Sequence, residues 1–159
     1  MNLFVNSFLE LIYVSYLCPV LRGELRKPST DNLQLKLRMY QSKPVSLILE
    51  NGSVFHGFSF GYESPTAGEV VFNTAMVGYP ESLTDPSYSG QILVATFPLI
   101  GNYGVPADST ENQLSAFYES EKVHVKGFIV SEYSFDYSHW NAAKSLSEWL
   151  IEEKVVGVY

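Results

Sequence analysis

A strand-like apolar stretch that leads into a rigid turn constrains this chain more than any other feature. Residues 68–74 (GEVVFNT) have the β-branched and aromatic content of a strand, and residues 78–88 (GYPESLTDPSY) follow closely. Pro80 and Pro86 fix their φ angles, and Asp85 before Pro86 favours a type I turn. So many special backbone residues are seldom needed for packing alone, so we expect this loop to meet a ligand or a partner.

The same loop carries three short oxygen-bearing side chains within four residues: Thr84, Asp85 and Ser87. Such a turn can present a hydroxyl and backbone N–H groups to a small polar ligand. Alternatively, these oxygens only cap their own backbone, as Asp, Ser and Thr often do in turns. The residues alone leave both interpretations open.

The charge is divided unevenly. Residues 1–43 carry six basic and three acidic residues, a net of +3, whereas residues 44–159 carry four basic and fourteen acidic residues, a net of −10. Nucleic-acid binding rests on Lys and Arg contacts to phosphate, so the acidic body argues against a nucleic-acid partner. It equally argues against a site that grips several phosphates.

Catalytic and metal-binding patterns are missing. Cys18 is the single cysteine, which excludes an intramolecular disulfide and favours an intracellular setting. His56, His124 and His139 are too far apart to form a metal-ligand motif. No phosphate-binding glycine loop and no nucleophile elbow is present. The sequence therefore predicts no catalytic residue and no metal site of its own.

Residues 1–43 form an N-terminal extension unlike the rest. The apolar segment 3–21 contains Glu10 and Pro19, which weakens a membrane-span interpretation, although a membrane anchor stays an alternative. Basic residues follow this segment, whereas a secretory signal begins with them. We expect a leader, a disordered appendage or an artefact of start-site choice.

Order is expected from Pro44 onward, in a strand-rich domain. Asn51-Gly52 predicts a type I′ hairpin turn, residues 91–97 form an uninterrupted apolar run typical of a central strand, and residues 98–106 read as a loop. Ser145 and Glu148 form a capping box that starts a helix. The expected strands are 45–50, 53–60, 69–73, 91–97, 123–130 and 155–159; the expected helices are 146–153 and a short one around 113–119.

Several of these segments resemble, in order and spacing, one known domain. It is the N-terminal domain of the small (glutaminase) subunit of glutamine-dependent carbamoyl phosphate synthase. The resemblance covers about residues 44–159, and residues 138–140 (SHW) look most like eukaryotic forms, in which the domain opens a large fused polypeptide. It rests on the segments 49–53 (LENGS), 57–61 (GFSFG), 68–74, 78–88, 91–93 (QIL) and 98–104 (PLIGNYG).

The resemblance implies an α/β fold, a three-layer β/β/α (swivelling-type) domain. It implies a ligase whose amidotransferase part hydrolyses L-glutamine, while an ATP-using synthetase portion combines the ammonia with bicarbonate. Ser87 stands at the position that contacts bound glutamine in the family. The catalytic cysteine, histidine and glutamate would belong to the following glutaminase domain, and ATP and Mg to the synthetase, so no cofactor is expected in this chain.

The resemblance also sets the expected context. The glutaminase and synthetase portions would be the partners, without nucleic acid or membrane, in cytoplasmic pyrimidine (UMP) biosynthesis. The mitochondrial urea-cycle form is an alternative, as is a stand-alone, non-catalytic interaction module. Strand 155–159 continues into further sequence in the family, so we expect a fragment or an incomplete gene model.

Overall fold

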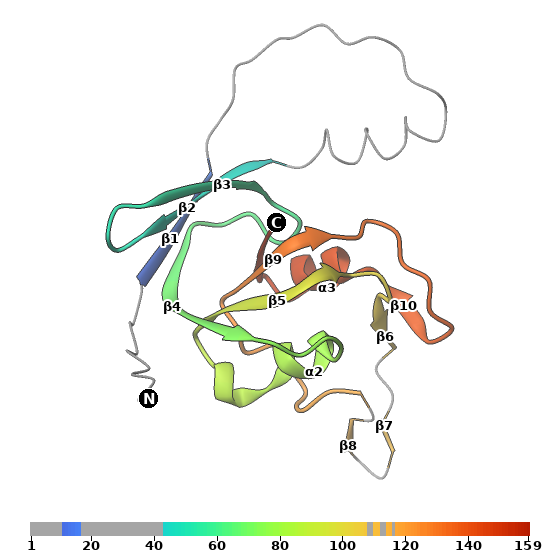
Figure 1. Ribbon diagram of the computed structural model, residues 1–159. Coiled ribbons are helices and arrows are strands. Elements are labelled where there is room, and N and C mark those ends of the chain that lie inside the picture. Colours follow the sequence, from blue (N-terminus) through green and yellow to red (C-terminus); the bar gives the residue numbers. More distant parts are fainter. Residues whose placement is uncertain (1–10, 17–42, 108–109, 112–113, 116) are drawn as a thin grey trace, which may run out of the picture.

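One seven-stranded sheet organises the described residues, which are 11–16, 43–107, 110–111, 114–115 and 117–159 of the computed structural model. The strand order is β11-β9-β5-β4-β1-β2-β3 (Figure 1). Strands β4, β5, β9 and β11 run parallel, whereas β1, β2 and β3 pair antiparallel and β1 joins β4 antiparallel. The sheet thus has a parallel half and an antiparallel half.

The elements have the following bounds. The strands of the large sheet are β1 Leu11–Tyr16, β2 Pro44–Leu49, β3 Val54–Phe58, β4 Thr66–Asn73, β5 Ile92–Ile100, β9 Gly127–Tyr133 and β11 Val156–Val158. Two small sheets pair β6 Val105–Pro106 with β10 Ala142–Lys144, and β7 Thr110–Glu111 with β8 Leu114–Ser115. The helices are α2 Tyr79–Thr84, the 3₁₀ turn η1 Pro86–Tyr88, and α3 Leu146–Glu152.

Two apolar cores lie on opposite faces of the parallel half. In β5, Ile92 packs with Val45 of β2, between the two halves of the sheet. The next residue, Leu93, joins a larger cluster with Leu146 and Leu150 of α3. Successive strand residues face opposite sides, so β5 is buried on both. The layers are antiparallel half, parallel half and helices, which confirms the expected three-layer β/β/α fold.

The two edges of the sheet meet in a backbone seam between β11 and the residues that follow β3. The Phe58 N–H donates to the Tyr159 carbonyl oxygen at 2.8 Å, and the Phe60 N–H donates to the Gly157 carbonyl oxygen at 2.9 Å. A Cβ at Gly61 would lie 2.5 Å from the Gly157 nitrogen. Glycine is required here because the two backbones approach more closely than any side chain allows.

The β2–β3 hairpin forms as expected, but its turn is of another type. Gly52 has a φ of 84°, while Asn51 is not among the residues with positive φ, so the predicted type I′ turn is wrong. The Gly52 N–H donates to the Leu49 carbonyl oxygen at 3.0 Å, and the Ser53 N–H donates to Asn51 Oδ1 at 2.8 Å. This is the three-residue hairpin loop, a type I turn followed by a left-handed glycine.

Strand β1 corrects the expectation that order begins at Pro44. Residues 11–16 pair with β2 on one side and β4 on the other, so Ile12 lies opposite both Leu49 and Gly68. Its LIYVSY sequence has the β-branched and aromatic content of a strand, and its neighbours would otherwise expose unpaired backbone groups. The other residues expected to form the extension, Lys43 apart, lie outside the described ones, and the domain boundary stays a prediction.

Three further expectations change. Strand β5 runs through Pro98 to Ile100 after a register shift, so the loop expected at 98–106 begins later. The short helix considered around 113–119 is not formed, since Leu114–Ser115 is strand β8. Strand β9 begins at Gly127 rather than at 123.

Helix α3 confirms the capping box. Ser145 Oγ accepts the Glu148 N–H at 3.2 Å, and the Glu148 carboxylate accepts the Ser145 N–H at 2.8 Å. Leu146, Trp149 and Leu150 form its buried face, as the i, i+3, i+4 spacing predicts. Neither α3 nor any other helix among the described residues has the length and apolarity that a membrane crossing requires.

We expect Gly61→Ala to lower the free energy of unfolding by about 1–3 kcal/mol, the usual cost of overpacking, because the seam must open to admit the methyl group. The matched control is Gly127→Ala, whose Cβ would meet no atom nearer than 3.5 Å. Urea unfolding of both variants measures the difference. Equal stability of the two would show that the seam is not tightly closed.

Candidate functional site

The segment 78–88, expected as a loop, contains helix α2 and the 3₁₀ turn η1; we call it the site loop, and its entry is fixed by the last residue of β4. Asn73 Oδ1 accepts the Ala75 N–H at 2.8 Å, which turns the chain as it leaves the sheet. Asn73 Nδ2 donates to Ser82 Oγ at 2.9 Å, and Ser82 Oγ in turn donates to the Gly78 carbonyl oxygen at 3.0 Å. The Oδ1 end of the side-chain amide thus holds the turn out of β4, and the Nδ2 end attaches α2 to the end of the strand.

The start of α2 is held by a tyrosine pair. Gly78 precedes the helix with a left-handed φ of 86°, and the N–H groups of Gly78 and Tyr79 both donate to the Tyr103 hydroxyl, at 2.9 and 3.1 Å. The two tyrosine rings stack at 4.2 Å, and the Tyr79 hydroxyl donates to the Gly104 carbonyl oxygen at 2.6 Å. Burial, with a contribution from Tyr103, raises the pKa of the Tyr79 phenol, which stays protonated as this bond requires.

The end of α2 is held by the buried hydroxyl of Thr84. Its Oγ1 donates to the Pro80 carbonyl oxygen at 2.9 Å and accepts the Glu119 N–H at 3.0 Å. The Ser120 hydroxyl donates to the Thr84 carbonyl oxygen at 2.7 Å. Thr84 is one of the few fully buried polar residues described, so this network anchors the turn that follows.

Asp85 shapes the turn that carries Ser87. Its carboxylate accepts the Ser87 N–H at 2.8 Å and caps the 3₁₀ turn η1. This backbone bond, followed by a bond from the Ser87 hydroxyl, lowers the pKa of Asp85 below its usual 3.8. Ser87 itself is exposed. The turn therefore presents an exposed serine whose backbone N–H is held by the Asp85 carboxylate.

A neighbouring extended segment braces the whole loop. The His124 N–H donates to the Leu83 carbonyl oxygen at 3.0 Å, and the His124 carbonyl oxygen accepts the Gly90 N–H at 3.0 Å. Further along, the Lys126 N–H donates to the Gln91 carbonyl oxygen at 2.8 Å. These three bonds clamp both sides of the Ser87 turn to the chain leading into β9, so the turn rests on rigid elements.

A serine–histidine pair lies beside the turn, but its hydrogen bonds serve the structure rather than catalysis. Ser120 Oγ lies 2.9 Å from His124 Nε2, within reach for general-base activation. The single Ser120 proton has other acceptors, however: the Thr84 carbonyl oxygen lies 2.7 Å and the Lys122 carbonyl oxygen 3.1 Å from Ser120 Oγ. We therefore assign this pair a structural role in bracing the turn.

The structure separates the three histidines. His56 lies on the edge strand β3 with Nδ1 3.2 Å from Ser46 Oγ, His124 braces the site loop, and His139 lies against the Tyr103 ring. Within the described ranges, no group of three or more His, Cys, Asp or Glu side chains could hold a metal ion. Cys18 lies outside the described residues.

Sequence reasoning found Thr84, Asp85 and Ser87 but missed their supports. The turn chemistry of Asp85 is local and visible in the DPS motif, and the structure buries Thr84 on one side of it in sequence while Ser87 on the other is exposed. Tyr103 and the segment from Glu119 to His124 contact the loop across 24 to 41 residues of sequence. Only a motif such as GNYG hinted that Tyr103 has a special role.

Comparison with known proteins gives one family. The family model described as "Carbamoyl-phosphate synthase small chain, CPSase domain" matches residues 47–159. The "Multifunctional protein pyr1-3" of Dictyostelium discoideum is 57% identical over 116 residues, and the "Carbamoyl phosphate synthase arginine-specific small chain" of Saccharomyces cerevisiae is 52% identical over 112 residues. The human "Carbamoyl-phosphate synthase [ammonia], mitochondrial" is 48% identical over 128 residues.

The matched segments cover most of this chain and little of the relatives. They take up 71%, 69% and 79% of this chain in the three comparisons. They take up 5% of the Dictyostelium protein, 27% of the yeast small chain and 8% of the human protein.

Replacing Thr84 by the isosteric valine removes the hydroxyl and leaves the Glu119 N–H without its acceptor. We expect a loss of about 1–3 kcal/mol in the free energy of unfolding, with faster amide exchange at Glu119. Thr84→Ser keeps the hydroxyl and serves as the control. A larger loss in the serine variant would assign the anchoring to the methyl group instead.

Acidification should release the Ser87 turn. Folding lowers the pKa of Asp85, so the ionised carboxylate stabilises the turn fully at pH values above the usual pKa of 3.8. This stabilisation is lost as the pH falls through the lower pKa of the folded state. The Ser87 amide resonance should therefore titrate with a midpoint below 3.8. Asp85→Asn should abolish this titration, and a midpoint above 3.8 would contradict the capping geometry.

Proposed function

Because this chain belongs to the carbamoyl-phosphate synthase small-chain family, we propose that it completes the glutamine site of a glutamine-dependent carbamoyl phosphate synthase. One observation carries this proposal: Asp85 caps an exposed turn and thereby holds out Ser87, the residue at the family's glutamine-contacting position. In this role the domain supplies one wall of the pocket, and the glutaminase domain supplies the reacting thiol.

The exposure of Ser87 suggests what the turn recognises. The Ser87 side chain is exposed, and its hydroxyl oxygen can accept a hydrogen bond from a donor on the ligand. Glutamine offers such donors in its α-ammonium group and its carboxamide N–H₂. The backbone clamp between residues 83–91 and 124–126 keeps this acceptor in place before substrate arrives.

The division of labour follows from the chemistry that this domain does not offer. Glutamine hydrolysis needs a nucleophile and a base in hydrogen-bond reach, and in the Ser120–His124 pair the serine hydroxyl also bonds the Thr84 carbonyl oxygen at 2.7 Å. In the proposed enzyme, the glutaminase portion releases ammonia and an ATP-using portion combines it with bicarbonate. This domain docks to both and performs neither step.

The proposed setting is pyrimidine biosynthesis in the cytoplasm. The pyrimidine part of this proposal is supported by the higher identity to the pyr1-3 protein, 57%, than to the yeast arginine-specific small chain, 52%, and the human mitochondrial protein, 48%. The second candidate is a domain of an ammonia-using synthase, favoured by the printed name of that mitochondrial relative. In such an enzyme the Ser87 turn would have no glutamine to contact, so Ser87 separates the two.

The test uses the yeast arginine-specific small chain, with its matching segment replaced by residues of this chain, assembled into a complete synthase. Ser87→Ala should raise the apparent KM for glutamine about 2- to 12-fold, equivalent to about 0.5–1.5 kcal/mol for one hydrogen bond. Synthesis from added ammonia should be unchanged. The matched control is Ser89→Ala, two residues along the same loop.

Two results would contradict the proposal. An unchanged KM for glutamine in the Ser87 variant would remove this turn from the glutamine site. A chimera that uses ammonia but never glutamine would favour the second candidate.

A further inference from the structure

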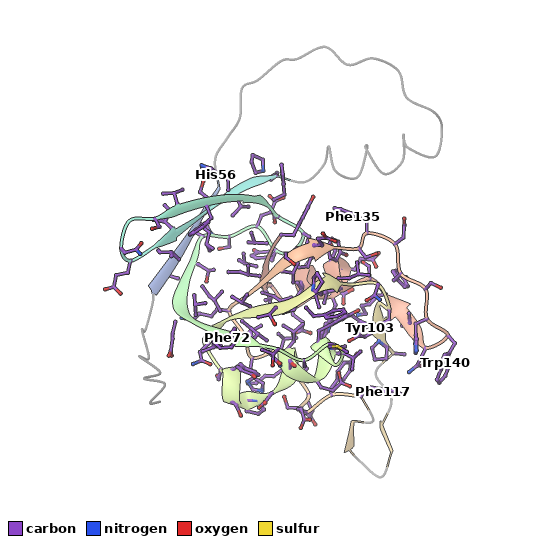
Figure 2. All side chains as sticks on the ribbon, viewed as in Figure 1. His56, Phe72, Tyr103, Phe117, Phe135 and Trp140 are labelled. Atoms are coloured by element: carbon purple, nitrogen blue, oxygen red, sulfur yellow. The ribbon has the colours of Figure 1, made fainter. Side chains whose placement is uncertain are left out.

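A cavity of about 460 Å³ opens at the other end of α2, away from the Ser87 turn. Its walls come from four segments: the start of α2, the residues after β5, Phe117, and the loop that enters β10. Figure 2 shows Tyr103, Phe117 and Trp140, which line this cavity, on the same side of the molecule near β6 and β10.

The cavity wall is aromatic and open to solvent. Trp140 is 88% exposed and touches only the His139 ring at 5.6 Å among its described aromatic neighbours. Val77, which also lines the cavity, is 73% exposed. A wall of large apolar side chains left this bare is typical of an interaction surface rather than of ordinary solvent-facing residues.

One carboxylate lies among these aromatic side chains. Glu81 lines the cavity, and no hydrogen bond or ion pair to its side chain is found in the described part of the chain. Within the same part, no lysine or arginine lines the cavity. The site therefore combines electron-rich ring faces with a carboxylate that has no lysine or arginine partner among the described residues.

Whatever covers this cavity must deal with that charge. An apolar side chain would bury the Glu81 carboxylate without a partner, which is costly. A cation would pair with the carboxylate and lie over the ring faces, and the planar guanidinium of arginine suits both contacts better than an ammonium. The net charge of −10 over residues 44–159 favours the same kind of partner.

We propose that this cavity receives an arginine side chain from another domain of the same enzyme. The identity of that domain rests on the proposed function; the cationic ligand does not. The relatives carry the matched segment as 5% to 27% of longer polypeptides, so a neighbouring domain is present at high local concentration. A single exposed side chain can then act as an anchor for docking.

The ligand is tested on the isotopically labelled chain itself, with N-acetyl-arginine methylamide as the probe. We expect the Trp140 indole N–H resonance to shift saturably, while the buried Trp149 stays still as an internal reference. N-acetyl-citrulline methylamide, the uncharged isostere, should bind about 2- to 5-fold more weakly, as should the arginine probe with the Glu81→Gln variant. Glu50→Gln, an exposed carboxylate of the hairpin turn, is the matched control.

Equal binding of the arginine and citrulline probes, or full arginine binding by the Glu81 variant, would overturn the cationic site. The side chains of Glu81 and Glu50 are both exposed, so the two glutamine variants should fold. Unchanged amide spectra outside the cavity would confirm that they do.

The partner is tested in the yeast chimera. Glu81→Gln and Trp140→Ala should each weaken one of two contacts of the domain in the chimera. A weaker contact with the synthetase is measured as weaker association of the chimeric small chain, and a weaker contact with the glutaminase domain as faster proteolysis between the two domains. If the probe binds but neither substitution changes association or proteolysis, the same-enzyme partner is wrong. The Ser87 KM is a separate readout, so a failure of the glutamine site and a failure of this cavity are distinguishable.

Discussion

The seam between β11 and the residues after β3 is the constraint on which the rest of the structure depends. It can form only because Gly61 and Gly157 let two backbones come within contact distance. Once closed, it folds the antiparallel half over the parallel half and creates the first apolar core. Strand β5 is then buried on both faces. The site loop leads into β5, so the position of the loop is fixed as well.

The sequence predicted what is local or periodic. The uninterrupted apolar run at 91–97 and the capping box at Ser145 each depend on neighbouring residues, and both were confirmed. The turn type predicted at Asn51 was wrong: the hairpin loop has three residues, Gly52 rather than Asn51 has the positive φ, and Asn51 Oδ1 accepts the Ser53 N–H. Strand β1 is not predictable from its own six residues, because their apolar and aromatic content is shared with membrane and signal segments and the pairing with β2 and β4 is long-range.

The candidate site shows the same division. Asp85 and Ser87 are two residues apart, so their capping contact follows from the DPS motif alone. The hydrogen bond between Thr84 and Glu119 joins residues far apart in sequence, and so do the two hydrogen bonds from the start of α2 to the Tyr103 hydroxyl. Only the closed sheet brings these segments together, and no spacing in the sequence predicts them. The aromatic cavity was equally hidden, because its walls come from four separated segments.

Helix α2 has a consequence of its own. It is six residues long, which at 1.5 Å per residue is about 9 Å, and both ends are pinned by hydrogen bonds. Its first turn lines the aromatic cavity and its last residue anchors the Ser87 turn. One short helix, held at both ends, therefore sets the separation of the two sites. The proposed docking cavity and the proposed glutamine-contacting turn share a single helical turn and a half.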